Sequence, residues 1–154
     1  MASPEQRLAE LGLAVPEVAA PVAAYVPAVR VGDLVYTSGQ LPMRSGKLII
    51  TGKVGAEVSA EEAYDCAQQC VLNALAAVRS QIGELSRVRR IVKVVGFVAS
   101  APEFCCQPQV INGASELLGR VFGDAGVHAR SAVGVLVLPL DAPVEVELIV
   151  EVGP

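Results

Sequence analysis

The nine residues Val144–Val152, VEVELIVEV, alternate between two kinds of side chain. Because successive side chains of an extended strand point to opposite faces of a sheet, this pattern predicts a strand with one buried face. The buried face would carry Val144, Val146, Leu148, Val150 and Val152. The other face would carry Glu145, Glu147, Ile149 and Glu151. A chain that contains this segment folds around a sheet.

A second apolar run, residues 131–138, precedes this strand and is small or apolar at almost every position. Such a run predicts a strand that is covered on both faces. Residues 139–143, PLDAP, have the composition of a turn and join the two strands. Arg130 stands at the start of the first strand, close to His128. A permanent cation entering a covered strand, with carboxylates on the partner strand, indicates a binding site.

Two helices are predicted from their ends. Residues 3–12 have Ser at the N-cap, Pro at the first helical position and Gly as a stop, which favours a short amphipathic helix. The longest helix begins after Ser59, where two glutamates fill the first turn, and ends at Gly83. Residues 15–24 are rich in Pro, Ala and Val without a period, so we expect an extended connector there.

A third helix is expected to begin at residues 100–103, SAPE, and to end at Gly123. Pro108 lies too deep for a normal helix start, because proline removes a backbone donor and clashes with the preceding turn. We therefore expect a broken first turn or a second start near Gln109.

The remaining strands complete the fold. Residues 26–31 and 33–40 read as a hairpin, residues 47–51 as a short strand, and residues 91–99 as a buried strand. The order β-β-β-α-β-α-β-β predicts the α+β class, with a mixed six-stranded sheet and two helices packed on one face.

Composition excludes several functions. The chain of 154 residues is one domain by size, and its 53% apolar content predicts apolar surface that another subunit covers. A net charge of −4 argues against nucleic-acid binding. No apolar run is long enough for a membrane span, and residues 1–10 lack the features of a signal peptide. Four cysteines without metal or secretory spacing predict reduced thiols in the cytoplasm and no metal site.

Two motifs resemble one family. ARSAVGVLVLP followed by VEVELIVEV, and upstream Tyr25-Val26 with GDLVYTSGQLP at residues 32–42, are similar to the Rid/YjgF family of small trimeric imine deaminases, once called L-PSP endoribonucleases. The resemblance covers roughly Ala24 to Val152, which divides the chain into an N-terminal extension, 1–23, and a domain, 24–154. It implies a chorismate mutase-like fold and a homotrimer with pockets between subunits. The implied reaction hydrolyses 2-imino or enamine acids to 2-keto acids and ammonia, with no cofactor.

The resemblance also assigns roles to residues. Arg130 matches the arginine that binds the substrate carboxylate, which a guanidinium can pair bidentately. Glu145 matches a glutamate that positions the attacking water. Ser38 and Tyr25 match residues that line the pocket and donate hydrogen bonds.

Two further matches carry reservations. Many family members have a cysteine two residues after the arginine, but this chain has Ala132. Thiol chemistry is therefore excluded there, and only the Ala132 backbone can contribute. Asn112 matches a helix asparagine at the neighbouring subunit's edge, after a short insertion around residues 105–109 is allowed.

Alternatives remain for several residues. Arg130 could instead form a structural ion pair with Glu145 or Glu147. The histidine at 128 is expected to be an exposed loop residue that the family does not require. Cys66 and Cys70, one helical turn apart, are expected to be buried core thiols.

Alternatives also remain for the function. The same arginine pocket could bind small carboxylates without turnover. An endoribonuclease or translation inhibitor, as in the older family label, would need a basic groove. A chorismate mutase would need more cations facing its dianionic substrate. Fold similarity alone does not decide among these.

Overall fold

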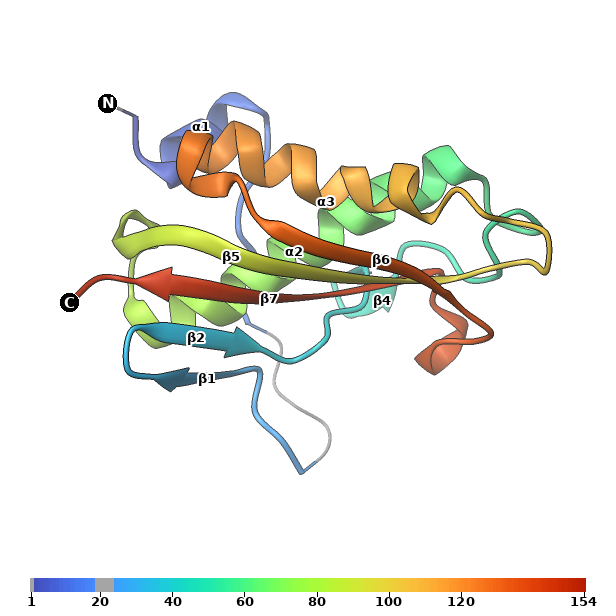
Figure 1. Ribbon diagram of the computed structural model, residues 1–154, viewed down its shortest axis with the longest axis horizontal. Coiled ribbons are helices and arrows are strands. Elements are labelled where there is room, and N and C mark those ends of the chain that lie inside the picture. Colours follow the sequence, from blue (N-terminus) through green and yellow to red (C-terminus); the bar gives the residue numbers. More distant parts are fainter. Residues whose placement is uncertain (1, 19–23) are drawn as a thin grey trace.

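The computed structural model describes residues 2–18 and 24–154 (Figure 1). Its main sheet has five strands in the order β1-β2-β7-β5-β6. The pair β5 and β6 is parallel, and the other neighbours are antiparallel. These strands are β1 (Ala28–Val31), β2 (Leu34–Thr37), β5 (Val88–Ala99), β6 (Ala129–Val135) and β7 (Val144–Val152).

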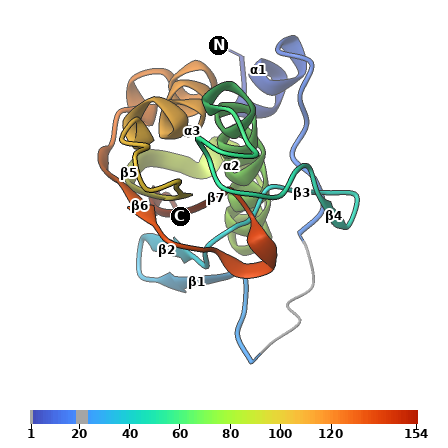
Figure 2. The same ribbon diagram turned by 90° about the vertical axis from the view of Figure 1, so that its right-hand side faces the viewer.

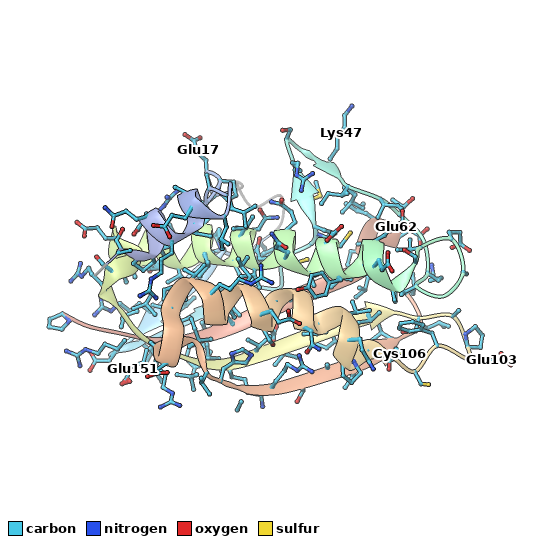
Figure 3. All side chains as sticks on the ribbon, turned by 90° about the horizontal axis from the view of Figure 1, so that it is seen from above. Glu17, Lys47, Glu62, Glu103, Cys106 and Glu151 are labelled. Atoms are coloured by element: carbon cyan, nitrogen blue, oxygen red, sulfur yellow. The ribbon has the colours of Figure 1, made fainter. Side chains whose placement is uncertain are left out.

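Two long helices, α2 (Ala60–Ile82) and α3 (Gln107–Phe122), lie side by side on one face of this sheet (Figures 1 and 3). We call this the helix face. The other face, which no helix of residues 2–18 and 24–154 covers, we call the open face. The α+β class and the placement of two helices on one face of a mixed sheet are therefore confirmed.

The prediction of six strands in one sheet was wrong. The third predicted strand lies instead in a separate hairpin of β3 (Met43–Arg44) and β4 (Lys47–Leu48), beside α2 (Figure 2). Gln40 still pairs with β7 through a single bridge, but Pro42 follows it and has no N–H to continue a ladder. The chain then turns back at Ser45 and Gly46, both with positive φ, and pairs with itself.

β7 is the middle strand of the sheet and has the predicted alternation. All five aliphatic residues on its helix face are at most 1% exposed, and the four residues between them are only partly buried. The aliphatic residues pack with the buried stripe of α2 and α3 in one hydrophobic core. This face of β7 therefore forms the floor of the core.

β6 is an edge strand, and the cover predicted for its second face is not supplied by the described residues of the same chain. Only its helix face is covered, and Val133 on its open face is 44% exposed. The apolar residues that follow are also exposed, Leu136 by 82% and Val137 by 59%. The open face carries further exposed apolar side chains at Val29, Val31 and Tyr36.

α2 has the predicted ends. The Ser59 hydroxyl accepts a hydrogen bond from the Glu62 backbone N–H, and the Glu62 carboxylate accepts one from the Ser59 N–H, which is a capping box. The helix ends at Gly83, whose φ of 86° favours glycine.

α3 does not begin at residues 100–103 but close to the alternative start predicted near Gln109. Residues 100–106 form a loop, and the helix starts at Gln107, so that Pro108 lies in its first turn, where a missing N–H costs nothing. The Ser100 hydroxyl donates to the Val98 carbonyl instead of capping a helix. The Gln107 side chain donates to the Phe104 carbonyl and to Ser100, which holds the loop against the helix start.

α1 (Pro4–Glu10) confirms the predicted short helix, with a capping box at Ser3. It packs against the end of α3, where Leu8 is 1% exposed in the shared core, whereas Leu11 remains 40% exposed. Part of the predicted connector, residues 19–23, lies outside the described residues. Among the helices of the described residues, none has the length and apolar character needed to cross a membrane.

Candidate functional site

Arg130 lies on the helix face of β6, at the border of the sheet and α3. It pairs in register with Val94 of β5, which in turn pairs with buried Leu148 of β7, so these three side chains share one face. Arg130 Nη1 donates to Asn112 Oδ1 at 2.8 Å and to Ser115 Oγ at 3.2 Å. Its Nη2 donates to the Pro108 carbonyl at 3.4 Å.

These contacts leave part of the guanidinium free. A guanidinium has five N–H groups, and the three hydrogen bonds leave Nε–H and one N–H of Nη2 without a partner among the described residues. These two nitrogens form one edge of the group. The ion pairs of residues 2–18 and 24–154 are Lys53–Asp141 and Arg120–Glu116, so Arg130 takes part in none of them.

The alternative of a structural ion pair with Glu145 or Glu147 was wrong for the single chain. Glu145 pairs with Phe97, and Glu147 with Val95, on the open face of the sheet. Arg130 is on the helix face, so the sheet itself separates the charges.

Asn112 and Ala132 lie beside Arg130. Asn112 projects from α3, and its side-chain oxygen accepts the shortest of the Arg130 hydrogen bonds. Ala132 shares the helix face of β6 with Arg130, two positions along. The Val135 carbonyl points toward β5, because it accepts from the Ser100 N–H. Since backbone groups alternate in direction along a strand, those of Ala132 point to the free edge.

We call Tyr25, Ser38 and Glu145 the sheet-side cluster, because Ser38 bonds to the residue after Tyr25 and precedes the glycine that contacts Glu145. The Ser38 hydroxyl donates to the Val26 carbonyl at 2.6 Å, which ties the end of β2 to the residue after Tyr25. Tyr25 itself is 53% exposed. Gly39 lies directly against the Glu145 carboxylate, and an added Cβ there would collide with it. Glycine at this position therefore makes room for the carboxylate.

Glu145 has an unusual environment for a carboxylate. It is half-buried, and no hydrogen bond to its side chain is found among the described residues. Burial raises its pKa above the ordinary value of 4.5, and the negative charge of Glu147 raises the pKa further. Its ionised form is therefore more basic than that of a solvated glutamate.

His128 lies in a loop, as predicted, but the prediction that it is exposed was wrong. The imidazole is partly buried, and its Nε2 lies 2.8 Å from Ser115 Oγ, the same hydroxyl that accepts from Arg130. Sequence reasoning also missed Ser115. Its spacing was the available signal, because a residue three positions after Asn112 shares its face of a helix. We call Arg130, Asn112, Ser115 and His128 the helix-side cluster.

The four cysteines fall into two pairs. Cys66 and Cys70 are buried, as predicted, and burial is the main cause that raises the pKa of Cys66 to about 11. Cys105 and Cys106 are exposed in the loop before α3. Figure 3 shows Cys106 at one end of the molecule. In the described part of the chain no three His, Cys, Asp or Glu side chains gather as metal ligands.

One cavity of the described residues does not hold the predicted site. It measures about 280 Å³, lies between the β3–β4 hairpin and α2, and is lined by polar groups including Arg44, Gln69 and Asn73. None of the residues predicted for the site lines it. Each cluster of the single chain is instead open at the surface.

Comparisons with known proteins agree with this architecture. The family described as "YjgF/chorismate mutase-like, putative endoribonuclease" matches residues 5–152. The crystal structure of Atu1372 from Agrobacterium tumefaciens, a protein described as having unknown function, has a TM-score of 0.90 and 49% identity, and covers 97% of this chain and 91% of its own. The shared fold is that of the YjgF proteins, and this chain belongs to the YjgF/chorismate mutase-like family.

Two relatives of known sequence extend the comparison. Protein TCP17 of Trypanosoma cruzi is 42% identical over 147 residues, which cover 95% of this chain and 92% of the relative. A protein named 2-iminobutanoate/2-iminopropanoate deaminase from Dermatophagoides farinae is 34% identical over 132 residues, 84% of this chain and 87% of its own. The resemblance predicted from the two motifs is thus confirmed at the level of the family.

Proposed function

We propose that the protein hydrolyses 2-imino acids, or their enamine tautomers, to 2-keto acids and ammonia in pockets shared between subunits of a homotrimer. The observation that carries this proposal is the free edge of Arg130. A buried or half-buried cation without a carboxylate partner is costly, and a bound carboxylate would remove that cost. A deaminase of this substrate class is also among the relatives.

Arg130 is the group that would bind the substrate carboxylate. The acceptors on α3 hold Nη1, so the Nε and Nη2 edge faces outward with two N–H groups for two carboxylate oxygens. The Ala132 backbone at the free edge of β6 would add a donor or an acceptor next to it.

Glu145 would position and activate the water. Its raised pKa makes it a better proton acceptor than a solvated carboxylate. Ser38, next to the glycine that contacts Glu145, and Tyr25 would supply hydroxyl groups to the pocket. Water adds to the imine carbon, and the carbinolamine that forms expels ammonia. In sum, one imine and one water give one keto acid and one ammonia, and no electrons are exchanged.

The positions of the two clusters support an assembly with pockets between subunits. Arg130 and Glu145 lie on opposite faces of one sheet, so one chain cannot present both to one substrate. If the edge formed by β6 and α3 packs on the open face of a neighbouring copy, the two clusters meet. The exposed apolar residues Val29, Val31 and Tyr36 are the surface that such a neighbour would cover.

The test is release of ammonia from imines generated in situ from several amino acids. The proposal predicts faster release with wild-type protein, and near-background rates with Arg130→Ala or Glu145→Gln that remain assembled. Stabilisation by keto acids without faster ammonia release would identify a carboxylate-binding module instead. RNA cleavage that survives Arg130→Ala would favour the endoribonuclease of the family description, although the net charge of −4 argues against it.

A further inference from the structure

We propose that Ser115 and His128 are positioning residues, which orient Arg130 so that its free edge faces a carboxylate ligand. This inference rests on the proposed function, because it takes Arg130 as the carboxylate-binding group. It concerns two residues that carry no role in the function proposed above. Hydrogen bonds lead from Arg130 through Ser115 and His128 to the Gly126 carbonyl, and we call them the hydrogen-bond chain.

The direction of each hydrogen bond follows from the chemistry of its ends. The Gly126 oxygen can only accept, so His128 Nδ1, 2.6 Å away, must donate to it. A neutral imidazole protonated at Nδ1 has a lone pair at Nε2, which therefore accepts from the Ser115 hydroxyl at 2.8 Å. Arg130 can only donate, so the Ser115 oxygen accepts from Nη1.

His128 thereby determines what Ser115 offers to Arg130. A serine hydroxyl has one proton and rotates freely unless a partner holds it. Because His128 Nε2 accepts the hydrogen bond from the Ser115 hydroxyl, the lone pairs of Ser115 remain directed at the guanidinium. Without His128, the hydroxyl proton could turn toward Arg130 and repel it.

Both ends of the hydrogen-bond chain are fixed by backbone that is packed in the fold. Gly126 is buried against α3, and a side chain at this position would collide with the Leu118 carbonyl. Ser115 and Asn112 are three residues apart on α3, so the helix presents both oxygens to the same nitrogen. An arginine loses rotamer entropy when it is immobilised, so a guanidinium that is already held binds a carboxylate at lower entropic cost.

The functional test uses assembled protein, 2-oxobutyrate as the ligand and imine hydrolysis as the reaction. Loss of one hydrogen bond predicts that Ser115→Ala and His128→Ala weaken 2-oxobutyrate binding about threefold to tenfold. They should raise KM by a similar factor and change kcat less, because ground state and transition state share the carboxylate contact. His128→Gln, which keeps an acceptor near the position of Nε2, should recover part of the affinity. Glu116→Gln, on an exposed neighbour in α3, is the matched control and should bind as wild type does.

A double variant distinguishes a hydrogen-bond chain that acts on Arg130 from two residues that merely pack beside it. Because His128 acts through Ser115, the variant with both alanines should bind as weakly as Ser115→Ala alone. Additive losses, or wild-type affinity in both single variants, would overturn the inference. If Arg130→Ala also bound 2-oxobutyrate as wild type does, the proposed function would fail first. If only Arg130→Ala lost binding, the proposed function would stand and this inference alone would be lost.

A spectroscopic test is independent of activity. The chain has one histidine, so an imidazole nitrogen NMR spectrum of tag-free protein contains a single ring. The inference requires a neutral ring with its proton on Nδ1 and a lone pair on Nε2. A ring protonated at Nε2 instead would contradict the donor and acceptor roles assigned to the two ring nitrogens of His128.

Discussion

Arg130 on β6 and Glu145 on β7 lie on opposite faces of the same sheet, with the single strand β5 between them. The sheet therefore separates the two side chains within one chain. If both act on one substrate, as proposed above, the second residue comes from another copy.

The two residues should complement each other between chains. Arg130→Ala and Glu145→Gln are each expected to be inactive alone, but a co-assembled mixture should be active. Each mixed trimer has one pocket with both native residues, so random assembly gives roughly a quarter of wild-type activity. Ammonia release after co-expression measures this, and light scattering should give three times the 16.0 kDa chain mass. Activity that never returns in verified mixed trimers would place both residues in one chain's pocket.

The affinity for a carboxylate should depend on the planar shape of the Arg130 guanidinium as well as on its positive charge. Charged hydrogen bonds contribute about 1.5–3 kcal/mol each, so Arg130→Ala should weaken pyruvate and 2-oxobutyrate binding by at least about tenfold. Arg130→Lys should recover only part, because an ammonium cannot pair both carboxylate oxygens in one plane. Calorimetry measures these affinities, with Arg120→Ala, an exposed arginine on α3, as the matched control. Equal binding by trimeric Arg130→Ala would mean that this arginine is structural.

The acid side of the pH profile should report Glu145. If the ionised carboxylate is the active form, kcat/KM falls as pH decreases through the pKa of Glu145, which lies above 4.5. Glu147→Gln removes the like charge that raises this pKa, so the acid limb should move to lower pH. Rate profiles of wild type and Glu147→Gln on one substrate test the direction. An unmoved limb, or one moved to higher pH, would assign it to another group.

Thiol reactivity should divide the cysteines into two pairs. Cys105 and Cys106 are exposed, whereas Cys66 and Cys70 are buried, with their pKa values raised by burial. A thiol reagent at neutral pH should therefore modify two cysteines of the native protein quickly and the other two only after denaturation. In the variant with serine at 105 and 106, fast modification should disappear. Fast reaction in that variant would show that α2 opens easily.

The two leucines of α1 should differ in their effect on stability. Leu8 is 1% exposed in the core, so Leu8→Ala should lower the free energy of unfolding by about 2–5 kcal/mol. Leu11 is 40% exposed, and Leu11→Ala should change it by less than about 0.5 kcal/mol. Denaturant unfolding measures both, and ligand binding by the folded variants should match wild type. Loss of binding in folded, trimeric Leu8→Ala would give α1 a part in the site.

The sequence predicted those parts of the fold that depend on residues close together along the chain. The alternation in β7 and the capping box of α2 depend on neighbours along the chain, and both were confirmed. The start of α3 was misplaced, because the same Ser-x-Pro-Glu pattern can cap a helix or close a loop. Only the contacts of Gln107 with that loop decide between the two.

The residues of the candidate site could be named from the sequence, but their positions on the two faces of the sheet could not. Arg130 and Glu145 were both named, yet their opposite faces depend on β5, which lies between β6 and β7 and sets the register of each. The contact between Ser115 and His128 depends on how the turn at residues 123–126 packs on α3. No pattern within either segment contains that information.

The central position of β7 has an evolutionary consequence. One strand forms the floor of the core with its even-numbered residues and carries Glu145 between two of them, Val144 and Val146. A mutation that enlarges or shrinks either valine displaces the carboxylate as well as the packing. Adaptation to a new substrate is therefore easier through α3 and the edge strand, where side chains can change without disturbing the middle of the sheet.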